Sequence, residues 1–215
     1  MVETQFILFL HCAVGSKIDR YKKIYYIVMD LLDFFKRVGN TNTNSNDETT
    51  LLAPTIPVEL TNYYFLKGSK AACKDPVLVQ FDGASDPNPG QSCGAAVVYT
   101  THESNSPVLA EGGIYLPLAT NNVAEYTGLI YGLELAKKKG VKALLIEGDS
   151  QLVVLQMAKR WQVKDMRMRT HWEKAQDLLK HFDFVAIKHV YRDFNQKADA
   201  LSKEGLRRRA HFERA

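Results

Sequence analysis

Four acidic residues stand where predicted strands end or where predicted helices begin, and their types suit metal-assisted chemistry. They are Asp82, Glu125, Asp149 and Asp199. Carboxylates gathered in one place repel one another unless cations neutralise them. Ligand sets made only of oxygen favour Mg²⁺ or Mn²⁺ over zinc. The pattern therefore indicates a divalent-metal site for in-line phosphoryl displacement, in which two ions roughly 3.5–4 Å apart contact the attacking and leaving oxygens.

Each acid also has an ordinary explanation when it is taken alone. Asp82 opens the Gly- and Pro-rich stretch DGASDPNPG and could be a solvated loop residue. Asp149 precedes Ser150 and a predicted helix, so it could cap that helix. Asp199 would be a surface residue of the last helix. The metal site is therefore predicted by the four acids jointly.

The elements that must position these acids follow one another in a distinctive order from residue 77 onward. The expected strands span 77–81, 94–100, 108–116, 142–147 and 184–190, and the expected helices span 120–139, 150–159, 168–180 and 195–207. Three successive strands followed by alternating helices and strands predict an α/β fold with a mixed sheet. Crossover connections make the first and fourth strands parallel neighbours, which would bring Asp82, placed at the end of the first, to Asp149.

The helix that carries Glu125 has two glycines on the same face. Gly128 and Gly132 lie three and seven residues further on, so they share the side of the helix that presents Glu125. Two glycines cost helix stability. We expect this face to lie close against the sheet, where it carries Glu125 towards the strand ends.

The stretches DGASDPNPG, TNNVAEY, IEGDSQLVV and RDFNQKADALS, in this order, resemble the type 1 ribonuclease H family. The resemblance covers residues 77–206, and WQVKD is typical of the compact archaeal, bacterial and plant-type branch. It implies a ribonuclease H-like fold, with a five-stranded mixed sheet flanked by helices. It further implies an endonuclease that hydrolyses the RNA strand of RNA/DNA hybrids with two Mg²⁺ ions, which Mn²⁺ can replace. By motif matching, the four acids are its metal-binding catalytic residues.

The loop before Asp199 departs from the family pattern, because YRDFNQ contains no His where many members carry a catalytic one. Arg192 stands where compact members carry an Arg. The resemblance gives it a part in catalysis or product release through a phosphate contact. The alternative is a surface Arg paired with Asp193. We expect His189, at a strand end, to pack rather than react.

The resemblance also implies contacts to the substrate from four residues beside the catalytic motifs. Asn88, Asn121 and Asn122 would contact the RNA strand, and Thr120 would contact a phosphate of the DNA strand. A side-chain amide can donate and accept at once, as recognition of a 2′-hydroxyl requires.

The segment 159–169, KRWQVKDMRMR, is basic and includes Trp161 and Lys164. Basic charge beside an aromatic ring suits a phosphate backbone. The alternative is a solvated turn with Trp161 packed on the core. The C-terminal LRRRAHFERA would add nonspecific attraction or fray.

Composition limits the remaining possibilities. The chain has 215 residues, a net charge of +4 and three cysteines without a CxxC pair, which favours an intracellular, reducing compartment without specifying which one. No apolar run is long enough to span a bilayer. Residues 6–14 have the length of a signal-peptide core but lack a basic segment before them.

Residues 1–76 are read as an N-terminal extension and residues 77–215 as the ribonuclease H domain. The extension contains a predicted amphipathic helix over 17–38 and a polar linker over 40–50. We expect a monomer, with a dimer through that helix as the alternative, and we expect deletion of residues 1–75 to leave cleavage largely intact. Two other functions stay open: a non-cleaving nucleic-acid-binding module with this fold, and a ribonuclease H domain derived from a retroelement. Double-stranded RNA remains a possible further substrate.

Overall fold

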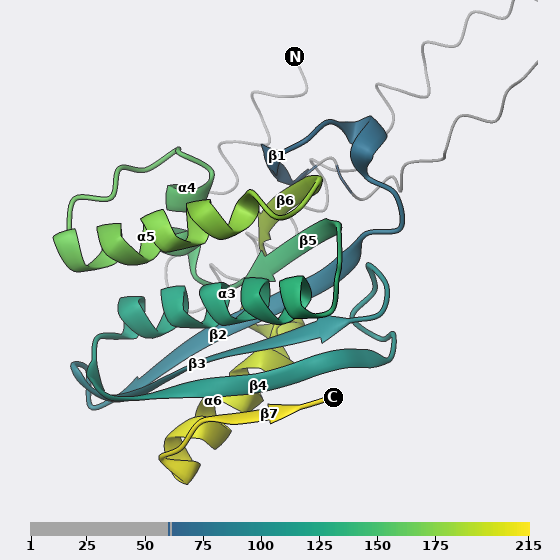
Figure 1. Ribbon diagram of the computed structural model, residues 1–215. Helices are drawn as coiled ribbons and strands as arrows, with labels where there is room; N and C mark the ends of the chain where they lie inside the picture. The colour runs from purple at the N-terminus through teal and green to yellow at the C-terminus, as the bar shows by residue number, and fades with distance from the viewer. Residues whose placement is uncertain (1–59, 61) are drawn as a thin grey trace, which may run out of the picture. The chain divides into compact units, whose positions relative to one another are not determined.

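The computed structural model describes residue 60 and residues 62–215, which are built around one seven-stranded mixed sheet (Figure 1). The strands are β1 (Tyr64–Lys67), β2 (Val77–Asp86), β3 (Gly90–Tyr99), β4 (Val108–Ala119), β5 (Ala143–Gly148), β6 (Phe184–His189) and β7 (Phe212–Arg214). The α-helices are α3 (Asn121–Lys138), α4 (Gln151–Met157), α5 (Met166–Leu179) and α6 (Gln196–Arg208), and a 3-10 helix, η4 (Arg192–Phe194), precedes α6. The strand order is β1-β6-β5-β2-β3-β4-β7.

The sheet confirms the predicted combination of an antiparallel meander with parallel strands. β2, β3 and β4 pair antiparallel, whereas β5 pairs parallel with both β2 and β6. The prediction of five strands was incomplete, because β1 pairs with β6 at one edge and β7 pairs with β4 at the other. These edge strands have four and three residues, which is too short for an alternating pattern to show in the sequence.

The prediction that β2 ends before Asp82 was wrong. The parallel pairing of β2 with β5 ends at Phe81 opposite Gly148, but the antiparallel pairing with β3 continues to Asp86 opposite Gln91. Asp82 therefore lies within a long hairpin, one residue beyond the end of its parallel neighbour.

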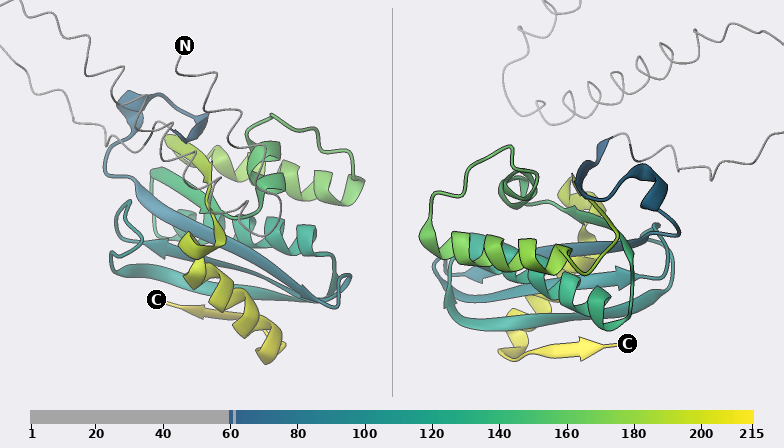
Figure 2. Two further views of the ribbon diagram at one scale, coloured as in Figure 1. Left: turned by 180° about the vertical axis from the view of Figure 1, so that it is seen from behind. Right: turned by 45° about the horizontal axis from the view of Figure 1, so that its top comes forward.

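Helices cover both faces of the sheet, as Figures 1 and 2 show. On one face, α3 and α5 enclose a core that includes Val79, Leu129 and Ile146. On the other face, where α6 packs, a second cluster includes Leu78 and Leu201. Residues before β1 belong to this second cluster, since it also contains the buried side chains of Leu60 and Tyr63. The described chain before residue 77 thus contributes to the core of the sheet.

The glycine face of α3 lies directly on the sheet, as predicted. A Cβ atom at Gly128 would come within 2.5 Å of the Asp82 carbonyl oxygen, and one at Gly132 within 2.6 Å of a Val79 methyl group. Any larger side chain at Gly128 would meet backbone atoms, which cannot turn aside. The helix can therefore approach β2 closely enough to place Glu125 beside Asp82.

The C-terminal residues form β7 on the edge of the sheet, so the alternative in which the tail frays is wrong, while nonspecific attraction by its basic residues stays a prediction. Arg214 pairs with Glu111 on β4 and with Glu204 on α6. The Phe212 ring lies 5.0 Å from the guanidinium groups of both Arg208 and Arg214. Charge pairing and ring contacts therefore fix β7 along β4 and α6.

Two sequence expectations concern parts of the chain before the sheet. The predicted helix over 17–38 and the polar linker over 40–50 lie outside the described residues. Among residue 60 and residues 62–215, none of the helices has the length and apolar character needed to cross a membrane.

Candidate metal centre

Three of the four predicted acids meet at one point. Asp82 on β2, Glu125 on α3 and Asp149, directly after β5, each offer a carboxylate oxygen, and these three atoms lie within 4.8 Å of one another. Parallel pairing brings the ends of β2 and β5 together, and the glycine face of α3 supplies Glu125. The arrangement is the one that the order of elements predicted, with Asp82 inside a hairpin rather than at a strand end.

The residues present fit a divalent cation. Oε2 of Glu125 is buried and has no hydrogen-bond partner among the described residues. A buried acceptor without a partner is costly, and two further carboxylates beside it increase that cost. A hard cation bound among the three carboxylates would satisfy the lone pairs and offset the repulsion.

The pKa values of two of the clustered carboxyl groups are raised by burial and by the neighbouring negative charges. Burial raises the pKa of Asp82 to about 7, and the charges of Asp149 and Asp199 add to the rise. Burial also raises the pKa of Glu125 well above its ordinary value, with Asp82 and Asp149 acting in the same direction. Without a cation, these two buried groups therefore bind protons far more readily than carboxyl groups in water do.

Two side chains that sequence reasoning missed hold the acids in place. The Ser202 hydroxyl, on α6, donates a hydrogen bond to Oδ2 of Asp82. Nδ2 of Asn195 donates to Oδ1 of Asp149 at 2.9 Å and to the Phe81 carbonyl at 2.8 Å. Ser202 could have been found from its position three residues after Asp199 on one helical face. Asn195 gave no such signal, because the first position of a helix suggests capping rather than a contact across the fold.

The fourth predicted acid, Asp199, lies outside the three-carboxylate cluster. Its Oδ1 accepts from Nε of Arg192 at 2.9 Å, and its Oδ2 accepts from Nζ of Lys203 at 2.6 Å. Burial acts to raise the pKa of Asp199, but the hydrogen bonds from Lys203 and Arg192 outweigh it and lower that pKa. Arg192 thus pairs with Asp199, and not with Asp193 as the alternative had it.

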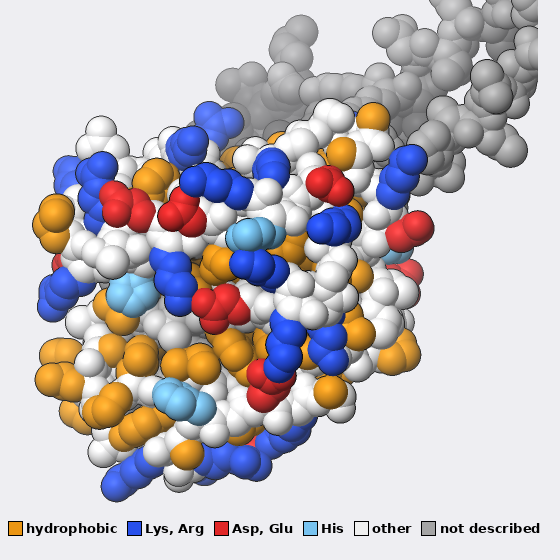
Figure 3. Space-filling view, viewed as in Figure 1, with side chains coloured by type: hydrophobic (Ala, Val, Ile, Leu, Met, Phe, Trp, Pro, Cys, Tyr) orange, Lys and Arg blue, Asp and Glu red, His pale blue; other side chains and the backbone are white. Residues whose placement is uncertain are grey.

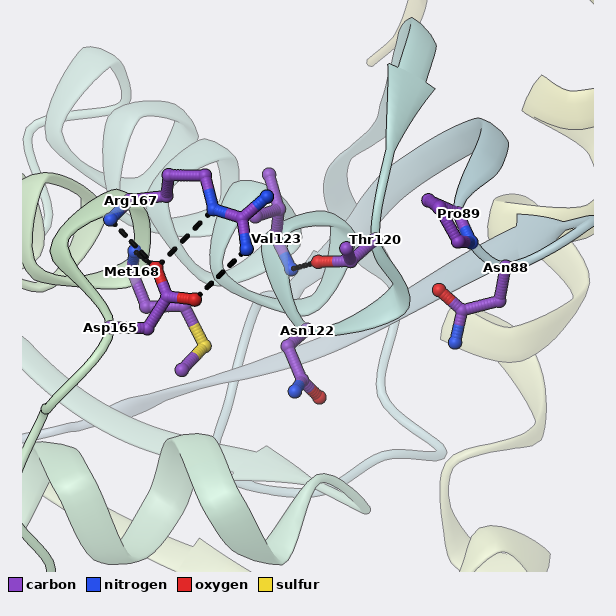
Figure 4. A pocket seen from close by; sticks show the side chains of 8 residues that line it. All are labelled: Asn88, Pro89, Thr120, Asn122, Val123, Asp165, Arg167 and Met168. Atoms are coloured by element: carbon purple, nitrogen blue, oxygen red, sulfur yellow. Dashed lines mark hydrogen bonds and ion pairs between the residues drawn. The ribbon is translucent and has the colours of Figure 1, made fainter.

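The predicted substrate residues gather near the N-terminus of α3. A hollow of about 350 Å³ is lined by Asn88, Pro89, Thr120, Asn122, Val123, Asp165, Arg167 and Met168 (Figure 4). Thr120 caps α3 by accepting from the Val123 amide at 3.4 Å. Oδ1 of Asn88 accepts from the Asn121 amide at 3.0 Å. Arg167 was not among the predicted contacts, and its guanidinium is paired with Asp165.

The basic segment after α4 presents Trp161 and Lys164 to solvent. The Trp161 side chain is exposed, so the alternative in which it packs on the core is wrong. The tryptophan that packs against the core in this region is the half-buried Trp172, whose Nε1 donates to the Gln156 carbonyl at 3.2 Å. Gln156 in turn donates to the Gln162 carbonyl, which anchors the segment. On the face shown in Figure 3, Lys and Arg are interspersed with acidic side chains.

The chain is similar in sequence to known proteins. The family described as reverse transcriptase-like matches residues 80–205. Ribonuclease HI of Halobacterium salinarum is 43% identical over 130 residues, which cover 60% of this chain and 64% of that protein. The bifunctional protein Rv2228c of Mycobacterium tuberculosis is 41% identical over 130 residues, and the matched part covers 35% of its length. The chain thus spans less than two thirds of each of these curated relatives.

Solved structures give the same likeness in three dimensions. RNase H1 from Halobacterium salinarum has a TM-score of 0.58 at 40% identity, over 62% of this chain and 98% of that one. LC11-RNase H1, solved in complex with an RNA/DNA hybrid, has a TM-score of 0.57 at 26% identity, over 61% of this chain and 97% of that one. From its motifs, its mixed sheet and these likenesses, the chain belongs to the reverse transcriptase-like family and, within it, to the type 1 ribonucleases H.

Proposed function

We propose that this protein is an endoribonuclease that hydrolyses the RNA strand of RNA/DNA hybrids with divalent metal ions. The observation that carries the proposal is the meeting of Asp82, Glu125 and Asp149, with the buried Oε2 of Glu125 left without a partner among the described residues. Binding of nucleic acid alone would not require three mutually repelling carboxylates at one point. The hybrid bound to LC11-RNase H1 supports the choice of substrate.

The proposed cofactor is a pair of Mg²⁺ ions, for which Mn²⁺ can substitute. Asp82, Glu125 and Asp149 would hold them, and Asp199 would join through an oxygen that now pairs with Arg192 or Lys203. When bound, such ions activate the attacking water and stabilise the charge that develops on the scissile phosphate. The chain's own part is to hold the carboxylates still, which Ser202 does for Asp82 and Asn195 does for Asp149.

Arg192 is proposed to contact a phosphate oxygen of the substrate. Its side chain is 66% exposed, so the guanidinium can be reached from solvent while Nε keeps its bond to Asp199. Planar guanidinium groups suit phosphate oxygens, to which they donate two parallel hydrogen bonds. We assign Arg192 to charge stabilisation or product release, in place of the His that the loop lacks.

The surface around the N-terminus of α3, which includes this hollow, is proposed to contact both strands of the hybrid. Asn88, Asn121 and Asn122 would read the 2′-hydroxyls of the RNA strand, since an amide can donate and accept at one site. Thr120 would donate its hydroxyl hydrogen to a phosphate of the DNA strand, because its oxygen already accepts from the helix. Trp161 and Lys164, both exposed, would extend the contact along the backbone.

The test is cleavage of a labelled RNA/DNA hybrid in Mg²⁺, with double-stranded RNA and double-stranded DNA in parallel reactions. Asp149→Asn is compared with Asp177→Asn, a matched change at an exposed Asp on α5. We expect the wild type and Asp177→Asn to cut the hybrid, and Asp149→Asn to be slower by at least about 100-fold, or about 2.7 kcal/mol of transition-state stabilisation. Equal rates in all three proteins would contradict the proposed site, and tight binding without cleavage would indicate a binding module instead.

A further inference from the structure

A buried polar network crosses the sheet on the face covered by α6, and the proposed reaction does not use it directly. Its members are Tyr63, Gln80, Tyr99, Glu147 and Lys188. Oε1 of Glu147 accepts from the Tyr63 hydroxyl at 2.7 Å and pairs with Nζ of Lys188 at 3.0 Å. The Lys188 ammonium also lies 4.7 Å from the centre of the Tyr63 ring. The network therefore joins the segment before β1 to four strands of the sheet, β2, β3, β5 and β6.

Gln80 is the member that reaches the active site. Its side chain is 2% exposed, and its Nε2 donates to Oε2 of Glu147 at 3.1 Å and to the Phe194 carbonyl at 2.9 Å. Its Oε1 accepts from the Tyr99 hydroxyl at 3.2 Å. A carboxylate and a carbonyl can only accept, so the nitrogen of the amide must face both of them. Both amide hydrogens are used, and the orientation of Gln80 is fixed.

The carbonyl that Gln80 holds lies one residue before Asn195. Asn195 is fully buried and bonds through Nδ2 to the Phe81 carbonyl and to Asp149. Two adjacent residues of β2 therefore form hydrogen bonds with the turn at 194–195. Gln80 bonds through its side chain and Phe81 through its backbone carbonyl. This double contact fixes where the Asn195 amide points, and hence where it holds the Asp149 carboxylate.

We propose that Gln80 is a positioning residue of the metal site, which acts by holding the turn at Phe194 so that Asn195 can orient Asp149. The inference rests on the proposed function of Asp149 as a metal ligand. Glu147 and Tyr99 hold Gln80 in turn, and Tyr63 extends this support to the segment that precedes β1. Gln80 itself touches none of the three carboxylates of the cluster through a hydrogen bond among the described residues.

The first test replaces Gln80 with a side chain of similar size that cannot bond. Gln80→Leu is compared with Leu78→Ala, a destabilising control on the same face of the same strand. Mn²⁺ affinity is measured by calorimetry on each protein in the absence of substrate. The kinetic constants kcat and KM are measured separately with an RNA/DNA hybrid. We expect Gln80→Leu to lose about 10-fold or more in Mn²⁺ affinity and in kcat, the usual cost of losing support around a metal site, while KM stays within about 2-fold because the substrate contacts remain. Leu78→Ala should lower Tm without these losses.

A folded Gln80→Leu protein with wild-type Mn²⁺ affinity and kcat would overturn the inference. The two hypotheses also fail differently. A wild type that binds Mn²⁺ but does not cleave would contradict the proposed function, and the Mn²⁺ affinities would still decide the role of Gln80. A wild type that binds no Mn²⁺ would overturn both.

The second test separates the two bonds of the Gln80 amide by exchanging charges. Gln80→Glu alone places two carboxylates side by side and should lower both Tm and kcat. Adding Glu147→Gln restores a donor between the two positions, but the side chain at position 80 then has no N–H to donate to the Phe194 carbonyl. We expect the double variant to recover Tm while kcat and Mn²⁺ affinity stay low. Recovery of kcat together with Tm would show that the bond to Phe194 is irrelevant, which contradicts the inference.

Discussion

Ser202 on α6 donates a hydrogen bond to Asp82 on β2, so the last helix of the chain reaches the carboxylate that lies within the first hairpin. The two residues are 120 positions apart. The bond to Asp82 uses the single hydrogen of this hydroxyl, whose oxygen also lies 2.9 Å from the Asp199 carbonyl oxygen within α6. This bond opposes the rise that burial causes in the pKa of Asp82. α6 therefore tunes the acidity of the cluster besides carrying Asp199.

Ser202→Ala should shift the pH dependence of cleavage. A hydrogen bond to a charged group contributes about 1.5–3 kcal/mol, so its loss should raise the pKa of Asp82 by about one unit or more. Metal binding needs the deprotonated carboxylate, and we expect the acidic limb of the kcat/KM profile to move to higher pH. Ser104→Ala, at an exposed position of the loop before β4, is the control. An unmoved profile would mean that the bond does not control this ionisation.

Asp82→Asn should stabilise the metal-free protein at high pH. The pKa of Asp82 is about 7 in the folded protein and about 3.9 in an unfolded chain. The folded state therefore holds the proton more tightly, and the stability that this confers is present below about pH 4 and lost as the pH rises through 7. The variant lacks this loss. Its free energy of unfolding should therefore exceed that of the wild type by an amount that grows between pH 4 and pH 8, towards at most about 4 kcal/mol, and the difference in Tm should grow with it.

The same comparison of wild type and Asp82→Asn should be repeated with saturating Mg²⁺. A ligand that binds only the folded state stabilises it by mass action, so Mg²⁺ should raise the Tm of the wild type at pH 8 and raise that of Asp82→Asn less. Asp177→Asn should follow the wild type under both conditions. A Tm difference that does not change with pH would contradict the assignment of the raised pKa to Asp82.

Gly128→Ala should disturb both the fold and the metal site. The added methyl group would lie within 2.5 Å of the Asp82 carbonyl and 2.8 Å of the Ala95 carbonyl, so α3 must move away from the sheet. Overpacking of this kind costs typically about 1–3 kcal/mol, measurable by urea unfolding. Because α3 also carries Glu125, Mn²⁺ affinity should fall as well. Lys137→Ala, at an exposed position of α3, should change neither quantity.

Two deletions should behave differently. Removal of residues 1–59 takes away none of the described contacts and should leave cleavage and Tm close to those of the full chain. Removal of residues 1–75 also removes β1, Leu60 and Tyr63, and with Tyr63 a hydrogen bond to Glu147. Burial of one large apolar side chain contributes about 1.5–3 kcal/mol, so the longer deletion should lower Tm by several degrees. Equal Tm values would mean that the segment before β2 does not support the sheet.

Sequence reasoning located the three clustered acids because their motifs combine residue type with position in a recognisable order of elements. The approach of α3 was also predictable, since Gly128 and Gly132 share a face with Glu125. The extent of β2 was not, because Pro and Gly after Asp82 suggest a loop, whereas pairing with β3 keeps the strand extended to Asp86. Local composition cannot show which partner strand will continue the hydrogen bonds.

Contacts made across the fold were the least predictable part of the site. Asn195, Ser202 and Gln80 bind partners that lie 46, 120 and 67 residues away. The residues next to them in the sequence do not indicate which partners these are. The pairing of Asp199 with Arg192 depends likewise on how η4 leads into α6, whereas Lys203 lies four residues after Asp199 on the same helix and could have been found from spacing. Spacing finds residues on one face of one helix, but it does not place side chains from separate elements opposite one another.

The short strand β7 has a consequence for how copies of this protein behave in concentrated solution. β4 is 12 residues long and without β7 would be the edge of the sheet, where unpaired backbone groups invite strand addition by another chain. β7 pairs with Glu111, Gly112 and Gly113 there, and His211 accepts the Tyr115 amide further along. Its charged residues are held by ion pairs within the fold, Glu213 with Lys138 on α3 and Arg214 with Glu111 and Glu204. Residues 211–214 thus occupy part of the β4 edge and oppose edge-to-edge aggregation.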